Sequence, residues 1–114
     1  MIKPGVLAEQ LAAKYFQQQG LTLLQANYSC RFGEIDLILL DGDTHVFAEV
    51  RLRSGSAFGG AAASIDARKQ AKIVRTAQHY LSSLQRIPPC RFDAILMQST
   101  DINRIEWIKN AFIV

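Results

Sequence analysis

Two acidic residues stand out because each lies inside an otherwise apolar stretch of sequence. Asp36 interrupts the stretch Ile35–Leu40, and thirteen residues later Glu49 interrupts the stretch Val46–Val50. Burying a carboxylate is costly unless a cation or hydrogen-bond donors compensate its charge. The two acids therefore depart from what folding alone requires, and such departures are typical of functional sites. They predict a site that binds a divalent cation.

Both stretches are predicted strands, in which successive side chains point to opposite faces. Asp36 should therefore share a face with Glu34 and Ile38. Ile35 and Leu37 should lie together on the other face.

The register between the two strands depends on the turn at Asp41-Gly42-Asp43, a sequence typical of hairpins. If the last two residues of this turn form the loop, Asp36 lies opposite Glu49. If the first two form it, Glu34 faces Glu49 and Asp36 becomes a diagonal neighbour. In either register the acids share a face with opposed Cβ atoms roughly 5 Å apart, so their charges repel each other.

Two neighbouring carboxylates of this kind need a divalent cation such as magnesium or manganese, or one of the two acids must hold a proton through a raised pKa. Such hard cations take carboxylate oxygens as ligands and keep several water molecules, which leaves room for a phosphate group and an activated water. This is the chemistry of phosphodiester hydrolysis. The alternative interpretation is an ordinary pair of edge-strand acids facing solvent. Arg51, two residues after Glu49 on the same face, and the basic segment that follows it favour the functional interpretation.

The positive charge of the chain is concentrated in one segment. Residues 51–91 carry eight basic side chains and one acidic side chain, whereas the whole chain has a net charge of only +3. This asymmetry predicts a polyanion such as nucleic acid as partner, although a solvated helix face can produce a similar pattern. The chain has no stretch of eighteen apolar residues and no apolar segment near its start. The sequence therefore predicts a cytoplasmic protein with no membrane contact.

A length of 114 residues with 49% hydrophobic content suits a single α/β domain over residues 1–114. Periodicity predicts two helices, over residues 4–19 and 64–84. It also predicts five strands, near residues 21–28, 34–40, 44–53, 91–97 and 104–108. The glycine-rich segment 54–63 contains no phosphate-loop pattern and is predicted to be a connector.

The second predicted helix carries a band of cations opposite its apolar side. At 100° per residue this band, called the basic stripe below, consists of Arg68, Lys72, Arg75 and His79. The first three lie in the first part of the helix, where the helix dipole disfavours positive charge. Phosphate contacts explain their placement better than helix stability does.

Three further side chains are candidates for the same site or surface. Lys69 lies at the border of the basic stripe and Gln70 lies on the apolar flank, so either could reach a site beneath the start of the helix. Arg53 shares the strand face of Glu49 and is a candidate contact for nucleic acid.

Four segments carry a resemblance to a known family: Asn27–Ile38, Val46–Arg53, Lys69-Gln70 and Cys90-Arg91-Phe92-Asp93. On these residues the chain resembles the YraN family of uncharacterised small proteins, within the restriction-endonuclease-like, or PD-(D/E)XK, superfamily. The resemblance covers nearly the whole chain. It implies a restriction-endonuclease-like core, in which a mixed central sheet of about five strands is flanked by two helices.

In the wider superfamily, which includes Holliday-junction resolvases, the pattern is an acid, a hairpin and then acid-x-Lys, with a further acid on the first helix. The resemblance implies that Asp36 and Glu49 are metal ligands and that Glu9 is the helix acid, a third residue predicted to bind the metal. Arg51 occupies the position of the lysine, which is the main departure. Because arginine stays protonated, Arg51 can orient water or stabilise phosphate charge but cannot act as a base. A metal-bound hydroxide could then serve as nucleophile without a lysine base, or Lys69 could supply an amine from the second helix.

The function that this resemblance implies is a metal-dependent endonuclease acting on DNA, branched or damaged DNA included, with Mg²⁺ or Mn²⁺ as cofactor. Its catalytic residues would be Asp36, Glu49, Arg51 and Lys69, with Glu34 and Gln70 in supporting positions. The alternative is a non-catalytic nucleic-acid-binding module that retains the nuclease fold. A third hypothesis is a protein-interaction domain. The sequence leaves the oligomeric state open, a homodimer included.

Overall fold

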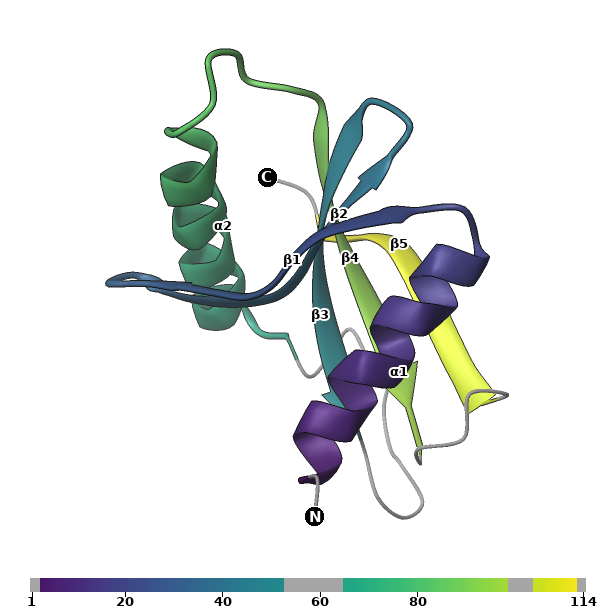
Figure 1. Ribbon diagram of the computed structural model, residues 1–114. Helices are drawn as coiled ribbons and strands as arrows, with labels where there is room; N and C mark the ends of the chain where they lie inside the picture. Colours follow the sequence, from purple (N-terminus) through teal and green to yellow (C-terminus); the bar gives the residue numbers. More distant parts are fainter. Residues whose placement is uncertain (1–2, 53–64, 99–103, 113–114) are drawn as a thin grey trace.

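The computed structural model describes residues 3–52, 65–98 and 104–112, and Arg53 lies outside them. These residues form a five-stranded sheet with one helix packed on each face (Figure 1). In chain order the elements are α1 (Pro4–Gln18), β1 (Thr22–Cys30), β2 (Gly33–Asp41), β3 (Thr44–Leu52), α2 (Ala67–Leu81), β4 (Cys90–Met97) and β5 (Ile105–Phe112). Within the described residues neither helix is long and apolar enough to cross a membrane.

The strands lie in sequence order across the sheet, from β1 at one edge to β5 at the other. The pairs β1–β2, β2–β3 and β4–β5 are antiparallel, whereas β3 and β4 are parallel. Parallel neighbours need a crossover connection, and α2 lies in this one. The predicted α/β class and mixed sheet flanked by two helices are confirmed, in agreement with a restriction-endonuclease-like core.

The β2–β3 hairpin has the first of the two registers considered above. Asp41 pairs with Thr44, and the ladder continues as far as the pair of Leu37 with Ala48. Gly42 has φ of +62° in the turn, a conformation that glycine adopts without steric cost. The turn therefore directs Asp36 and Glu49 toward each other at the end of this ladder.

The alternation predicted for β2 fails next to Asp36. Ile35 was expected on the face of Leu37, but it packs with Ile38 in the core on the side of α2, while Leu37 packs on the side of α1. In the β1–β2 register, Asn27 lies across from Asp36 and has φ of +55°, in the left-handed region. This irregularity of the strand pair breaks the simple two-residue period at Asp36.

Each helix covers its own hydrophobic core. On one face of the sheet, α1 buries Ala8, Ala12 and Phe16 against a set of strand residues consisting of Leu37, Leu39, Val46, Ala48, Ile95 and Met97. On the other face, α2 buries Ile73 and Ala77 against Ile38, Phe47, Phe92 and Ala94. The sheet is thus fixed from both sides at the strands that carry the two acids.

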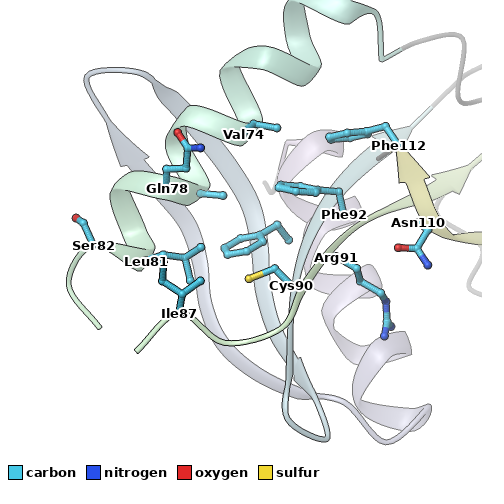
Figure 2. Close-up of a pocket in the computed structure, with 12 residues that line it drawn as sticks. Val74, Gln78, Leu81, Ser82, Ile87, Cys90, Arg91, Phe92, Asn110 and Phe112 are labelled. Carbon is cyan, nitrogen blue, oxygen red and sulfur yellow. The ribbon is translucent and has the colours of Figure 1, made fainter. Parts of the chain in front are cut away.

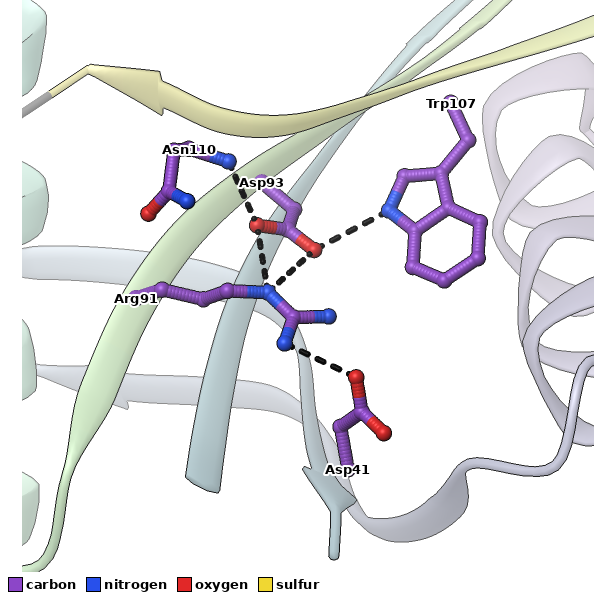
Figure 3. Close-up of polar contacts among 5 residues, drawn as sticks. All are labelled: Asp41, Arg91, Asp93, Trp107 and Asn110. Carbon is purple, nitrogen blue, oxygen red and sulfur yellow. Dashed lines mark hydrogen bonds and ion pairs between the residues drawn. The ribbon is translucent and has the colours of Figure 1, made fainter.

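Asp93 is a third acid in the middle of a strand, and it is fully buried. Its carboxylate accepts hydrogen bonds from Arg91 Nε at 3.1 Å, Trp107 Nε1 at 3.0 Å and the backbone N–H of Asn110 at 3.0 Å (Figure 3). Arg91 Nη1 also lies 2.8 Å from Asp41 Oδ2. Protein donors thus satisfy Asp93, which joins β4 to β5, and Arg91 extends this network to Asp41 of the β2–β3 hairpin.

Candidate active site

Asp36 and Glu49 lie beside the first turns of both helices. Two hollows meet at this pair, one of about 290 Å³ on the side of α2 and one of about 390 Å³ on the side of α1. Lys69 lines both hollows, and Glu9 and Arg51 line the one beside α1. The structure therefore brings most of the predicted site residues to one place.

The Asp36 side chain is hydrogen-bonded to the backbone of β3 at the point where the β2–β3 ladder ends. Its Oδ2 accepts a hydrogen bond from the backbone N–H of Val50 at 2.8 Å. Burial raises the pKa of Asp36, while that hydrogen bond and the charges of Lys69 and Arg51 act in the opposite direction. One carboxylate oxygen of Asp36 is thus committed to the backbone, and this hydrogen bond fixes the direction of the side chain.

Glu49 is only 4% exposed. Burial, followed by the negative charge of Asp36, raises its pKa to about 7. Lys69 Nζ lies 3.5 Å from Glu49 Oε2 and, with Arg51, partly offsets this effect. A buried carboxyl group with a pKa near neutrality, next to a second acid and a lysine, is typical of a functional site.

Glu9 approaches the pair from α1. Burial and then the charge of Asp36 raise its pKa, while the side chain of Asn27 acts in the opposite direction. Among the residues that the structure describes, no three Asp, Glu, His or Cys side chains are grouped so as to hold a metal ion together. Glu9 nevertheless has the position predicted for the helix acid, in contact with Asp36.

Lys69 reaches the acids because of how α2 begins. Asp66 caps the helix, and its Oδ1 accepts a hydrogen bond from the backbone N–H of Lys69 at 2.9 Å. Gln70, the other candidate, turns away and donates from Nε2 to the backbone carbonyl of Ile65 at 2.9 Å. Gln70 therefore stabilises the segment that leads into α2, and Lys69 is the residue that contacts Glu49.

The basic stripe lies on the outer surface of α2, as predicted, since all four of its side chains are exposed. Lys72 also lines the hollow beside the acid pair, so the stripe begins at the site itself. Glu34 is exposed and lines the same hollow, and its negative charge acts on Asp36 and Glu9. The stripe and the two acids form a continuous surface.

Asn27 is a residue of the site that the sequence reasoning missed. Its side chain acts to lower the pKa of Glu9, and its left-handed backbone lies across from Asp36. Asparagine adopts positive φ more readily than most residues. An asparagine inside a predicted strand, level with an acid of the neighbouring strand, was the signal that could have revealed it.

A larger cavity, of about 570 Å³, lies elsewhere, between α2 and strands β4 and β5 (Figure 2). Its lining is mainly apolar and includes Val74, Leu81, Phe92 and Phe112. None of the residues predicted to act in catalysis or metal binding lines it. The acid pair, and not this cavity, has the groups needed for hydrolytic chemistry.

The sheet, its two helices and the paired acids define an α/β protein with the core that the sequence predicted. The model of the uncharacterised protein family UPF0102 matches residues 8–97, so the chain belongs to this family, in agreement with the YraN resemblance. A UPF0102 protein of Nitrosomonas europaea is 61% identical over 95% of this chain and 92% of the relative. UPF0102 proteins of Psychromonas ingrahamii and Ectopseudomonas mendocina are 57% and 48% identical, over 95% of this chain and 88% and 92% of the relatives.

Proposed function

We propose that this protein is a metal-dependent nuclease that hydrolyses phosphodiester bonds in DNA, branched or damaged DNA among its substrates. The observation that carries the proposal is the group formed by Asp36, Glu49 and Lys69. It joins the buried Glu49 and the half-buried Asp36 to an amine, with Lys69 Nζ 3.5 Å from Glu49 Oε2, at one end of an exposed basic stripe. A DNA substrate implies a cytoplasmic site of action.

Asp36 and Glu49 suit Mg²⁺ or Mn²⁺ because both offer carboxylate oxygens, and the repulsion between them favours a cation. When bound, such an ion supplies Lewis acidity and an activated water. Glu9 lines the hollow beside α1 together with both acids. Asp36 and Glu49 would hold the ion, and Glu9 would orient the water that it activates.

The two cations have different parts in this proposal. Lys69 reaches the acids from α2, so its amine replaces the lysine that the superfamily has two residues after the second acid. Arg51 stays protonated and stabilises negative charge that develops on the phosphate. The basic stripe would hold the phosphates of the nucleic-acid backbone, which makes binding dependent on salt.

The alternative function is a nucleic-acid-binding module without catalysis. The observation that favours it is Arg51 itself, because a residue that cannot act as a base stands in the position of the superfamily lysine. The two functions share the basic stripe and differ in whether a metal ion is needed.

The test is incubation of the protein with labelled duplex, single-stranded and branched DNA, with Mn²⁺, with Mg²⁺ or with a chelator. We expect cleavage only with the metal ion, and none from Asp36→Asn, which keeps an oxygen to accept the Val50 hydrogen bond and so retains the fold. The matched control is Glu106→Gln, which alters an exposed acid on β5. Calorimetric titration with Mn²⁺ should show binding that Asp36→Asn loses. DNA binding without cleavage by the wild type under every condition would support the binding module instead.

A further inference from the structure

The turn between β1 and β2 carries an arginine and a phenylalanine at its two central positions, Arg31 and Phe32. Cys30 pairs with Gly33, so these residues form a two-residue hairpin loop. Neither Arg31 nor Phe32 has a positive φ, because Gly33, with φ of +148°, supplies the unusual backbone angle of this turn. Turn geometry therefore sets no requirement for an aromatic and a cationic side chain at these two positions.

The hairpin is braced against α2, and its turn extends beyond the helix (Figure 1). A Cβ atom on Gly33 would lie 3.2 Å from Thr76 Oγ1, tighter than an ordinary contact, so glycine favours this close approach of strand and helix. The Tyr28 hydroxyl is hydrogen-bonded to His79 Nδ1, and the Phe32 ring contacts the His79 ring edge to face with centroids 6.1 Å apart. These contacts hold the turn in a fixed position next to the basic stripe.

Phe32 is only partly buried, and the Arg31 guanidinium lies 4.8 Å from the centre of its ring. Arg31 is exposed and adds a fifth basic side chain beside the four of the stripe. Glu34 is also exposed and is the nearest acid along this strand. It lines the hollow beside the acid pair and is not one of the two turn residues. The surface thus combines a row of cations with a rigidly mounted aromatic ring at its far end.

The distance along this surface suits a nucleic-acid strand. Lys69 and His79 are ten residues apart on α2, which corresponds to about 15 Å along the helix. A strand in B-form geometry rises roughly 3.4 Å per nucleotide, so about four nucleotides would separate the acid pair from the turn. A ring at such a place can stack on a base only where the base is not paired, since paired bases are already stacked in the duplex.

We propose that Phe32 is a stacking platform for an unpaired base of a nucleic-acid strand whose backbone follows the basic stripe, with Arg31 contacting a phosphate next to that base. This inference rests on the proposed function and narrows its substrate class to nucleic acid with a single-stranded segment about four nucleotides from the acid pair. Neither the paired acids nor the metal ion takes part in this contact.

The experiment measures affinity by fluorescence anisotropy in the presence of a chelator, so that cleavage plays no part. The probes are a labelled single strand and a blunt duplex of the same sequence. Phe32→Leu keeps an apolar side chain against His79 but removes the aromatic face, and it should weaken single-strand binding by about 5- to 100-fold while duplex binding changes much less. Arg31→Ala should reduce the salt slope for the single strand by about 0.7. The control is Ile87→Ala, since Ile87 is 84% exposed and lines the separate apolar cavity.

Phe32→Trp separates stacking from folding. It should restore single-strand affinity, and its fluorescence should be quenched by the single strand more strongly than that of the wild type, whose single tryptophan is half-buried against α1. Unchanged single-strand affinity in Phe32→Leu, or absence of quenching in Phe32→Trp, would overturn the stacking role while the nuclease proposal stood. Absence of binding to either DNA by the wild type would overturn both.

Discussion

Replacing Glu49 with glutamine should stabilise the metal-free protein at pH 8 but not at pH 4. The physical reason is the environment of the side chain, which is 4% exposed and next to a second acid. In the folded protein burial and the charge of Asp36 make ionisation of Glu49 more costly. In the unfolded chain the same carboxyl group ionises at its ordinary pKa. Glutamine resembles the neutral form in shape and never ionises.

The magnitude follows from the pKa of Glu49, which is raised from 4.5 to about 7. Each pKa unit is worth about 1.4 kcal/mol, so ionising Glu49 lowers the free energy of unfolding by about 3 kcal/mol. Because the folded pKa is raised, the stability is fully present below pH 4.5 and is lost as the pH rises through about 7. Glu49→Gln should therefore equal the wild type near pH 4 and exceed it by about 3 kcal/mol at pH 8, or about 10 °C in Tm.

The assay is thermal unfolding followed by circular dichroism at several pH values from 4 to 8, with a chelator present. The quantity of interest is the difference in Tm between variant and wild type at each pH, because this difference removes the contribution of all other titrating groups. Glu106→Gln removes an acid at an exposed position on β5 and serves as control for the loss of one carboxyl group. Added Mn²⁺ at pH 8 should stabilise the wild type but not Glu49→Gln.

A difference between Glu49→Gln and the wild type that stays constant from pH 4 to pH 8 would refute the reasoning. It would mean that Glu49 ionises in the folded protein as readily as in the unfolded chain. The pair would then be a solvated pair of acids, the alternative interpretation of the sequence.

Three further predictions concern the other charged groups. Replacing Arg68, Lys72 and Arg75 of the basic stripe by alanine should weaken binding to all DNA sequences about equally. The salt slope measured in anisotropy titrations should fall by ~0.9 for each phosphate that is no longer neutralised. An unchanged slope would mean that this helix face is merely solvated. Arg51→Lys should preserve or raise the cleavage rate, and Arg51→Ala should lower it without abolishing Mn²⁺ binding; cleavage indifferent to Arg51→Ala would exclude Arg51 from the mechanism. Asp93→Ala leaves Arg91 without its buried partner and should cost about 3–5 kcal/mol in urea unfolding. DNA binding per folded molecule should stay the same, and a selective loss of binding would contradict a purely structural role.

The parts of the fold that were predictable are those set by local sequence. The hairpin itself follows from Asp41-Gly42-Asp43, but this turn sequence allowed two registers, and the structure has the one in which Asp41 pairs with Thr44. The prediction for β5 ended at residue 108, but the strand continues to Phe112. Asn110 has φ of +52°, and the β4–β5 register shifts near this point, so the alternation on which the prediction relied is interrupted there.

The candidate site was predictable where burial makes a residue costly, and not where it depends on how elements cross. Asp36 and Glu49 stood out as acids in apolar strands. Whether Lys69 or Gln70 contacts the acids depends on how α2 lies over the sheet, and helix periodicity does not predict that placement. Asn27 was missed because its role in the site depends on its left-handed backbone in β1, at the position level with Asp36 in β2. Metal binding and nuclease activity stay predictions.

The connection between β3 and β4 has a consequence for the order of folding. β1, β2 and β3 are joined by short turns and pair with their neighbours in sequence, so their contacts close small loops, whereas the parallel β3–β4 pair closes only after the chain has passed through α2. Pairings that close short loops form faster than those that close long ones. Asp36 and Glu49 should thus meet in the early three-stranded unit, before Lys69 arrives with α2. Mild acid neutralises Glu49 and should therefore accelerate formation of the three-stranded unit in refolding. The docking of α2, which brings Lys69 to Glu49, should follow as a later step.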